Sequence, residues 1–91
     1  MEIKERAAGV LRRHDVAEAY LFGSVVRGDD RANSDVDILV RFKRLRGLFE
    51  YMRTKLELEE ALDGRTVDLV QMEAVKPALR PFIERDKVRI V

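Results

Sequence analysis

The chain has 91 residues, of which 46% are hydrophobic, and its 18 basic and 17 acidic residues give a net charge of +1. This balance gives no general attraction to nucleic acid or to a membrane, so we expect neither partner. The chain has no cysteine, which excludes disulfides and thiolate sites and fits a cytoplasmic protein. No apolar run is long enough for a signal peptide or a membrane span. We therefore expect one small domain over residues 1–91, burying roughly 60–65% of its unfolded surface.

Hydrophobic spacing predicts alternating helices and strands along the chain. The first predicted element is an amphipathic helix over residues 2–14, followed by a strand over 17–22, a short helix after Gly23-Ser24 and a polar loop over 28–34. A strand over 35–41, a helix over 47–62 and a strand over 66–70 come next. Pro77 opens a helical turn, Pro81 kinks or restarts it before residues 82–86, and a final short strand covers 88–91. This order predicts an α+β fold, with a small mixed β-sheet and helices packed on one face.

The helix over residues 47–62 has an unusual pattern. Its apolar side chains fall on one broad face, namely Leu48, Phe49, Met52, Leu56 and Leu62. Lys55 and Glu59 intrude on that face as an i, i+4 pair. Simple core packing does not predict charges there, so the face is either partly uncovered or in contact with a partner.

Two acidic residues, Asp35 and Asp37, stand one residue apart in a strand pattern. Val36, Ile38 and Val40 form its buried face, so both aspartates share the opposite face. Their Cα atoms should lie roughly 6.5 Å apart. Like charges this close repel unless a cation joins them. Mg²⁺ prefers oxygen ligands, often carboxylates together with substrate phosphates, and therefore resolves the repulsion.

The Gly23-Ser24 pair ends the preceding apolar strand. Glycine lets the backbone turn sharply and come close to a ligand. Ser24 is a favoured helix N-cap, so we expect it to cap the short helix that follows. Free N–H groups at a helix start hold anions, including phosphates. The pair therefore predicts a place for a triphosphate beside the metal.

A third acidic residue, Asp68, lies in the later strand pattern. Val67 and Leu69 should face one side of that strand, and Thr66, Asp68 and Val70 the other. If this strand neighbours that of Asp35 and Asp37, Asp68 completes a cluster of three carboxylates. Such clusters hold two metal ions ~3.5–4 Å apart and stabilise an in-line displacement.

Two groups of cations stay open to more than one interpretation. Arg27 either reaches the phosphates or the acceptor, or pairs with Asp29 or Asp30. The basic segment 41–46 carries four cations directly after the acidic strand. It either contacts phosphate, RNA or an acidic partner surface, or is a solvated linker.

These motifs together resemble the nucleotidyltransferase core of the DNA polymerase beta superfamily. The matching residues are Gly23-Ser24, Arg27-Gly28, Ser34-Asp35-Val36-Asp37 and the isolated Asp68. More narrowly, the chain resembles the minimal nucleotidyltransferases (MNT proteins) of prokaryotes, over nearly its whole length. The resemblance implies a palm-like core. It also implies that Gly23 and Ser24 bind ATP, that Asp35 and Asp37 coordinate two Mg²⁺ ions, and that Asp68 binds one metal and helps to activate the attacking hydroxyl.

The resemblance also implies a partner. MNT proteins are commonly paired with a HEPN-domain ribonuclease toxin, which they silence by moving AMP from ATP onto a tyrosine hydroxyl. The chain is thus expected to be the antitoxin of such a pair and to form a hetero-oligomer with its toxin. Two alternatives remain, namely an antitoxin that masks its toxin by binding alone, and a nucleotidyltransferase with a small-molecule acceptor such as an aminoglycoside.

Overall fold

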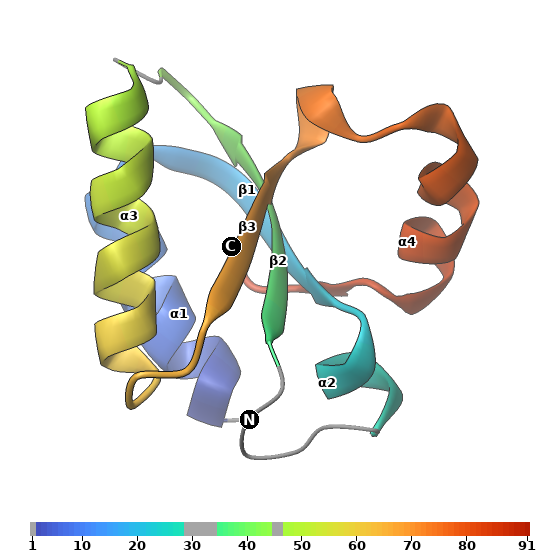
Figure 1. Cartoon of the computed structure of the whole chain (residues 1–91), viewed down its shortest axis with the longest axis horizontal. Coiled ribbons are helices and arrows are strands. Elements are labelled where there is room, and N and C mark those ends of the chain that lie inside the picture. The colour runs from blue at the N-terminus through green and yellow to red at the C-terminus, as the bar shows by residue number, and fades with distance from the viewer. Residues whose placement is uncertain (1, 29–34, 45–46) are drawn as a thin grey trace.

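A four-stranded mixed β-sheet forms the centre of the fold (Figure 1). The computed structural model describes residues 2–28, 35–44 and 47–91. In chain order the strands are β1 (Val16–Phe22), β2 (Val36–Phe42), β3 (Val67–Gln71) and β4 (Val88–Arg89). They lie in the order β3-β2-β1-β4, with β1 antiparallel to β2 and β4, and β2 parallel to β3. The predicted α+β fold with a mixed sheet is confirmed.

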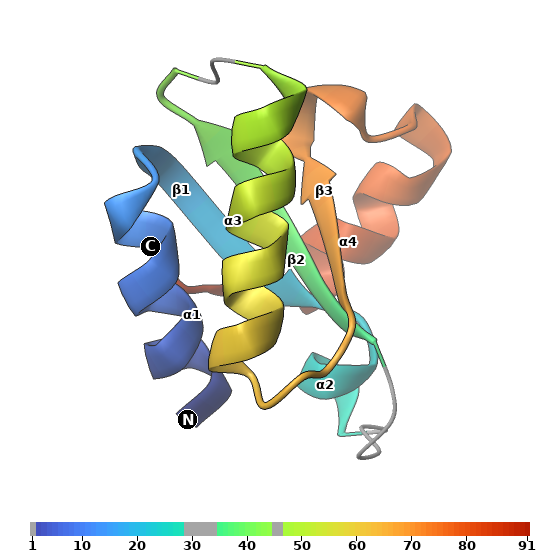
Figure 2. The same ribbon diagram turned by 60° about the vertical axis from the view of Figure 1, so that its left-hand side comes forward.

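Helices lie on both sides of this sheet. They are α1 (Glu2–Arg13), α2 (Ser24–Arg27), α3 (Leu48–Ala61) and α4 (Arg80–Asp86), with 3₁₀ turns η1 (Met72–Ala74) and η2 (Pro77–Leu79). The long helices α1 and α3 pack side by side on one face, as predicted (Figure 2). The prediction that helices pack on one face does not extend to the short α4, which lies over the other face, where the chain crosses the sheet from β3 at one edge to β4 at the other (Figure 1). We call this second side, which α4 covers in part, the open face.

The predicted elements appear within two residues of their predicted bounds. Pro81 lies in the first turn of α4, where its missing N–H costs nothing, so the helix restarts there as expected. The predicted loop 28–34 lies outside the described residues apart from Gly28.

Alternating side chains on β2 separate the core from the open face. Val36, Ile38 and Val40 are fully buried, packed with residues of α1, β1, α3 and β3. Burying side chains of this size stabilises a fold by about 1.5–3 kcal/mol each. Because neighbouring strand residues point to opposite faces, this burial directs Asp37 and Leu39 to the open face.

Helix α3 buries a narrower stripe than its apolar residues suggest. Thr54 and Leu58 are buried, and the Thr54 hydroxyl donates a hydrogen bond to the Glu50 carbonyl oxygen (2.8 Å). Four large apolar side chains remain between 41 and 90% exposed, namely Leu48, Phe49, Met52 and Leu56. We call these four residues the apolar α3 face. Within the described ranges, no helix is both long and apolar enough to cross a bilayer.

The Lys55–Glu59 pair, unexplained by the sequence, joins α3 to β3. Lys55 Nζ lies 2.8 Å from Glu59 Oε2, and the same oxygen accepts a hydrogen bond from the backbone N–H of Val67 (2.9 Å). Both hydrogen bonds lower the pKa of Glu59, and the one from Lys55 has the larger effect. The ionised carboxylate thus stabilises the folded chain above the unfolded pKa of Glu59, and this contribution disappears as the pH falls through the folded pKa.

Replacing Glu59 by glutamine is expected to destabilise the fold by about 1 kcal/mol at neutral pH, since hydrogen bonds to a charged group are lost. Urea unfolding at pH 7 and at pH 3 measures the effect, which should shrink at pH 3. The control is Glu60→Gln, because Glu60 is the exposed neighbour of Glu59 on the same helix. An equal loss of stability at both pH values would contradict the assigned role of the carboxylate.

Candidate active site

The pairing of β2 with β3 brings the predicted acidic residues to one place. The two strands are parallel, and Asp37 lies directly opposite Asp68 in the register. Opposite residues in neighbouring strands point to the same face, so both carboxylates belong to the open face. Asp35 lies two residues before Asp37, at the entrance of β2. The strand adjacency on which a three-carboxylate cluster depended is therefore present.

Electrostatics shows that the charges of Asp35 and Asp68 act on Asp37. Burial raises the pKa of Asp37, and the charges of Asp68 and Asp35 raise it further. Arg27 acts in the opposite direction. Asp37 is half-buried, whereas Asp35 and Asp68 are exposed. The ionised form of Asp37 is thus disfavoured in the protein alone, which is the situation that a nearby cation relieves.

The donor set suits Mg²⁺, although the side chains are not gathered into a ligand shell. Among the residues that the structure describes, no group of three or more His, Cys, Asp or Glu side chains could hold a metal ion as it stands. Three carboxylates on adjoining strands nevertheless supply only oxygen ligands, which Mg²⁺ prefers. The residues present therefore fit the metal.

Gly23 lies against Asp37 at the end of β1. Its φ of +78° and ψ of −150° belong to a region that side chains rarely adopt. A Cβ atom here would collide with Oδ2 of Asp37 and lie 3.2 Å from its Cγ. Only glycine allows the backbone to come this close to the carboxylate. The predicted turn is present, and the contact with Asp37 requires glycine more strictly than the turn alone.

The predicted role of Ser24 as N-cap is wrong. Gly23 is the N-cap of α2, Ser24 is its first residue, and no side chain makes a capping hydrogen bond. The reason is the backbone of Gly23, whose carbonyl oxygen accepts from the N–H groups of Val26 and Arg27 (both 3.1 Å). Ser24 is therefore placed directly after the close approach of Gly23 to Asp37.

Arg27 connects α2 to α4. Its Nη1 lies 3.2 Å from Oδ2 of Asp86, a residue far away in the sequence. The predicted alternatives Asp29 and Asp30 lie outside the described residues. Together with Gly23 and Asp37, this ion pair lines a cavity of about 250 Å³ at the open face. Arg27 therefore lies in the lining of the candidate site, and its predicted contact with phosphate or acceptor stays a prediction.

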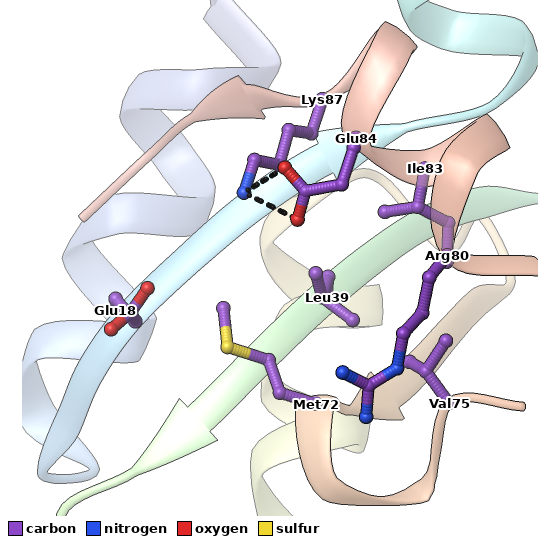
Figure 3. Close-up of a pocket in the computed structure, with 8 residues that line it drawn as sticks. All are labelled: Glu18, Leu39, Met72, Val75, Arg80, Ile83, Glu84 and Lys87. Atoms are coloured by element: carbon purple, nitrogen blue, oxygen red, sulfur yellow. Dashed lines mark hydrogen bonds and ion pairs between the residues drawn. The ribbon is translucent and has the colours of Figure 1, made fainter. Parts of the chain in front are cut away.

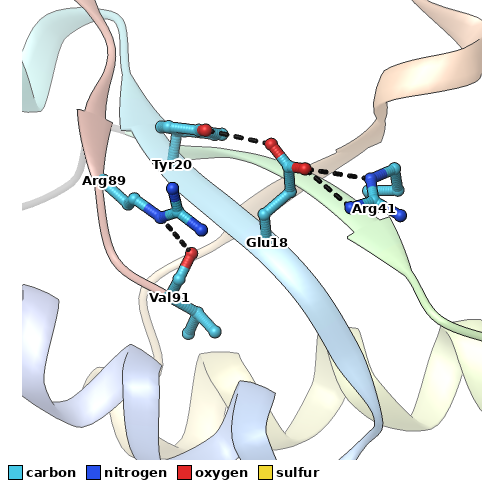
Figure 4. Close-up of polar contacts among 5 residues, drawn as sticks. All are labelled: Glu18, Tyr20, Arg41, Arg89 and Val91. Atoms are coloured by element: carbon cyan, nitrogen blue, oxygen red, sulfur yellow. Dashed lines mark hydrogen bonds and ion pairs between the residues drawn. The ribbon is translucent and has the colours of Figure 1, made fainter.

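A second polar network lies further along the open face (Figure 4). The Tyr20 hydroxyl donates to Glu18 Oε1 (2.9 Å), and Arg41 donates to Glu18 Oε2 from Nε (3.0 Å) and Nη2 (2.7 Å). Arg41 is thus held by β1, whereas Lys43 and Arg44 are exposed. Residues 45 and 46 of the basic segment lie outside the described residues.

Tyr51 of α3 lies near Asp68. Its hydroxyl donates to the Leu69 carbonyl oxygen, and burial together with the charge of Asp68 raises the pKa of Tyr51. Sequence reasoning missed two residues that line the cavity, namely Asp86 and Phe82 of α4. No sequence signal links these residues to the motif, because only the return of the chain across the open face brings α4 beside β1.

Comparisons with known proteins agree with this geometry. A protein of Methanocaldococcus jannaschii, whose name marks it as a candidate protein adenylyltransferase, is 37% identical over 99% of this chain and 96% of its own length. The protein adenylyltransferase MntA of Thermococcus cleftensis is 38% identical over 86% of this chain and 78% of its own length. A crystal structure of a toxin-antitoxin with AMP-PNP superposes with a TM-score of 0.82 at 26% identity, covering 97% of this chain and 72% of that chain.

The family described as "Polymerase beta, Nucleotidyltransferase" matches residues 5–91. These residues include every element that positions the three carboxylates and the Gly23 turn. The chain therefore belongs to the polymerase beta nucleotidyltransferase family.

Proposed function

We propose that this chain is an antitoxin that transfers AMP from ATP to a tyrosine hydroxyl of a HEPN-domain ribonuclease toxin, with Mg²⁺ as cofactor. The observation that carries the proposal is the register of β2 and β3, which sets Asp37 opposite Asp68 with Gly23 packed against Asp37. The names of its relatives, a protein adenylyltransferase and a toxin-antitoxin with AMP-PNP, support the reaction and the partner. In this proposal residues 1–91 act as a single minimal nucleotidyltransferase domain, in the cytoplasm where ATP is available.

Each residue of the candidate site has a role in the proposed reaction. Asp35, Asp37 and Asp68 would hold two Mg²⁺ ions, and Gly23, Ser24 and Arg27 would bind the triphosphate. When bound, the metal supplies positive charge that stabilises the triphosphate and its pyrophosphate leaving group. The acceptor oxygen forms a bond to the α-phosphorus as the bond to the β-phosphate oxygen breaks. Asp68 would orient this hydroxyl and accept its proton.

The acceptor hydroxyl would come from another molecule. The chain has two tyrosines. The Tyr20 hydroxyl donates to Glu18, and the Tyr51 hydroxyl donates to the Leu69 carbonyl oxygen. Asp68, in contrast, is exposed on β3, a strand at the edge of the sheet. An acceptor from a partner protein therefore has access to the carboxylate that would receive its proton.

The second candidate function is masking of a toxin by binding alone, and the apolar α3 face favours it. Leu48, Phe49, Met52 and Leu56 leave a contiguous side of α3 exposed. Contiguous apolar patches of this kind mark sites of protein contact. Such a face supports binding of a toxin whether or not AMP is transferred, so an experiment must separate the two functions.

The test incubates the purified chain, Mg²⁺ and its HEPN-domain partner with ATP labelled at the α- or the γ-phosphate. We expect label on the partner from the α position only, at a tyrosine identified by mass spectrometry, together with loss of its ribonuclease activity. Loss of ribonuclease activity without ATP would favour masking instead. Label from the γ position would identify phosphorylation and contradict the proposal.

A further inference from the structure

The cavity beside Asp37 is lined by both polar and apolar residues. The polar residues are Gly23, Arg27, Asp37 and Asp86, the first three of which belong to the proposed triphosphate and metal site. The apolar residues, which we call the apolar lining, are Phe22 of β1 with Leu79, Phe82 and Ile83 of the crossing segment. A single ligand that contacts both sets must therefore carry a charged part and a flat or apolar part.

The size of the cavity limits what it can hold. Its volume of about 250 Å³ is below the ~300–1,000 Å³ of pockets that bury a whole drug-sized ligand. It suits one part of a nucleotide, with the remainder extending along the carboxylates in the open. Since the proposed phosphate site is at Gly23 and the carboxylates, the part left for the apolar lining is the base.

Phe82 has the properties of a stacking surface for a base. The residue is 57% exposed although its neighbour Ile83 anchors α4 with only 8% exposure. The guanidinium carbon of Arg85 lies 5.6 Å from the centroid of the Phe82 ring, within the range of a cation–π contact. An exposed aromatic ring next to a phosphate site offers a surface on which any base can stack, because every base has a π-face.

We propose that the apolar lining of this cavity binds the purine base of the nucleotide and that Phe82 stacks on it. This inference rests on the proposed function, in which ATP is the substrate. Phe82 is then a positioning residue for the base, and Arg27 with Gly23 marks the phosphate end of the same molecule. The ion pair between Arg27 and Asp86 connects α2 to α4, the helix that carries Phe82.

A neighbouring cavity on the open face is the competing location for the base. Its volume is about 220 Å³. Figure 3 shows Met72 and Val75 at the bottom of the view, Arg80 at the right, Leu39 in the middle and the Lys87–Glu84 ion pair (3.0 Å) at the top. It shares Ile83 with the cavity beside Asp37. None of the residues that line it belongs to the candidate triphosphate site, so a base bound there would lie apart from its phosphates.

The experiment compares binding of ATP and of inorganic tripolyphosphate, both with Mg²⁺, by isothermal titration calorimetry. Phe82→Ala should weaken ATP binding by at least about fivefold, the low end for loss of a base–aromatic stack, and leave tripolyphosphate binding unchanged. Phe82→Tyr keeps a ring and should retain ATP affinity. Phe49→Ala is the matched control, an aromatic that is 90% exposed on α3, and Met72→Ala tests the neighbouring cavity.

The outcomes separate this inference from the proposed function. Unchanged ATP affinity in Phe82→Ala, or an equal loss for ATP and tripolyphosphate, would overturn the stacking role. A loss in Met72→Ala but not in Phe82→Ala would move the base to the neighbouring cavity and overturn it too. Phe82→Ala with intact ATP binding but weaker binding of the toxin would make this surface a protein contact. Failure of the unmodified chain to bind ATP would overturn the proposed function together with the inference.

Discussion

Replacing Asp35 and Asp37 together by asparagine is expected to reduce AMP transfer at least about 10³-fold. Removing a single group that stabilises charge in a transition state already costs about 10²–10³ in rate. Here two of three proposed metal ligands lose their charge while keeping their shape. Transfer of α-labelled AMP from ATP to the HEPN-domain partner measures the effect.

The same double substitution should leave the fold intact. Burial and the neighbouring acids raise the pKa of Asp37, so its ionised form costs folding free energy at neutral pH. Asparagine removes that cost, and the thermal midpoint at pH 7 in EDTA should equal or exceed that of the unmodified chain. The control is Asp15→Asn with Asp63→Asn, two exposed aspartates at positive φ, a region that asparagine tolerates. Full transfer by the Asp35/Asp37 variant would show that these carboxylates do not hold the metal.

Replacing Gly23 by alanine is expected to reduce transfer by about 10²-fold and to destabilise the fold by about 1–3 kcal/mol. The destabilisation follows from the φ of +78°, which an alanine adopts only with strain. The loss of activity follows from the Cβ atom, which would push the Asp37 carboxylate out of place. Displacing a catalytic group by about 1 Å is enough for a loss of this size.

The control for this variant separates strain from displacement. Gly64 also has a positive φ, +82°, but a Cβ there meets no atom within 4 Å. Gly64→Ala should therefore lower the stability without affecting transfer. Chemical unfolding and the transfer assay are measured on both variants. If both lose activity equally, strain alone explains the loss and the contact with Asp37 has no catalytic importance.

The positions of the acidic residues could be predicted because a strand with one buried face has only one other face. The alternation of Val36, Ile38 and Val40 is enough to give the direction of Asp37, and all three side chains are buried as this requires. The neighbour of that strand could not be predicted in this way, since alternation carries no information on pairing. The pairing of β2 with β3 and its register come from the structure. The metal and phosphate roles of these residues stay predictions.

The environment of α3 and α4 was harder to predict, for two reasons. Apolar residues on α3 suggested a core contact, yet the apolar α3 face is exposed, as one of the two sequence interpretations allowed. The partner of Arg27 is Asp86, which is remote in sequence, whereas local reasoning considered only Asp29 and Asp30. Both cases depend on contacts across the tertiary fold, which a local pattern does not encode.

The parallel pairing of β2 with β3 also limits how the chain can vary in length. The connection from α3 to β3 is short and is held at both ends by hydrogen bonds. At its start the Gly64 N–H donates to the Glu59 carbonyl oxygen (2.8 Å), and at its end the Val36 N–H donates to the Thr66 carbonyl oxygen (2.9 Å). Losing one residue there would shift β3 by one position and turn Asp68 toward α1 and α3. Insertions and deletions should therefore be tolerated far less in this connection than in an ordinary surface loop, and a shortened homologue that keeps an aspartate nearby need not keep the chemistry.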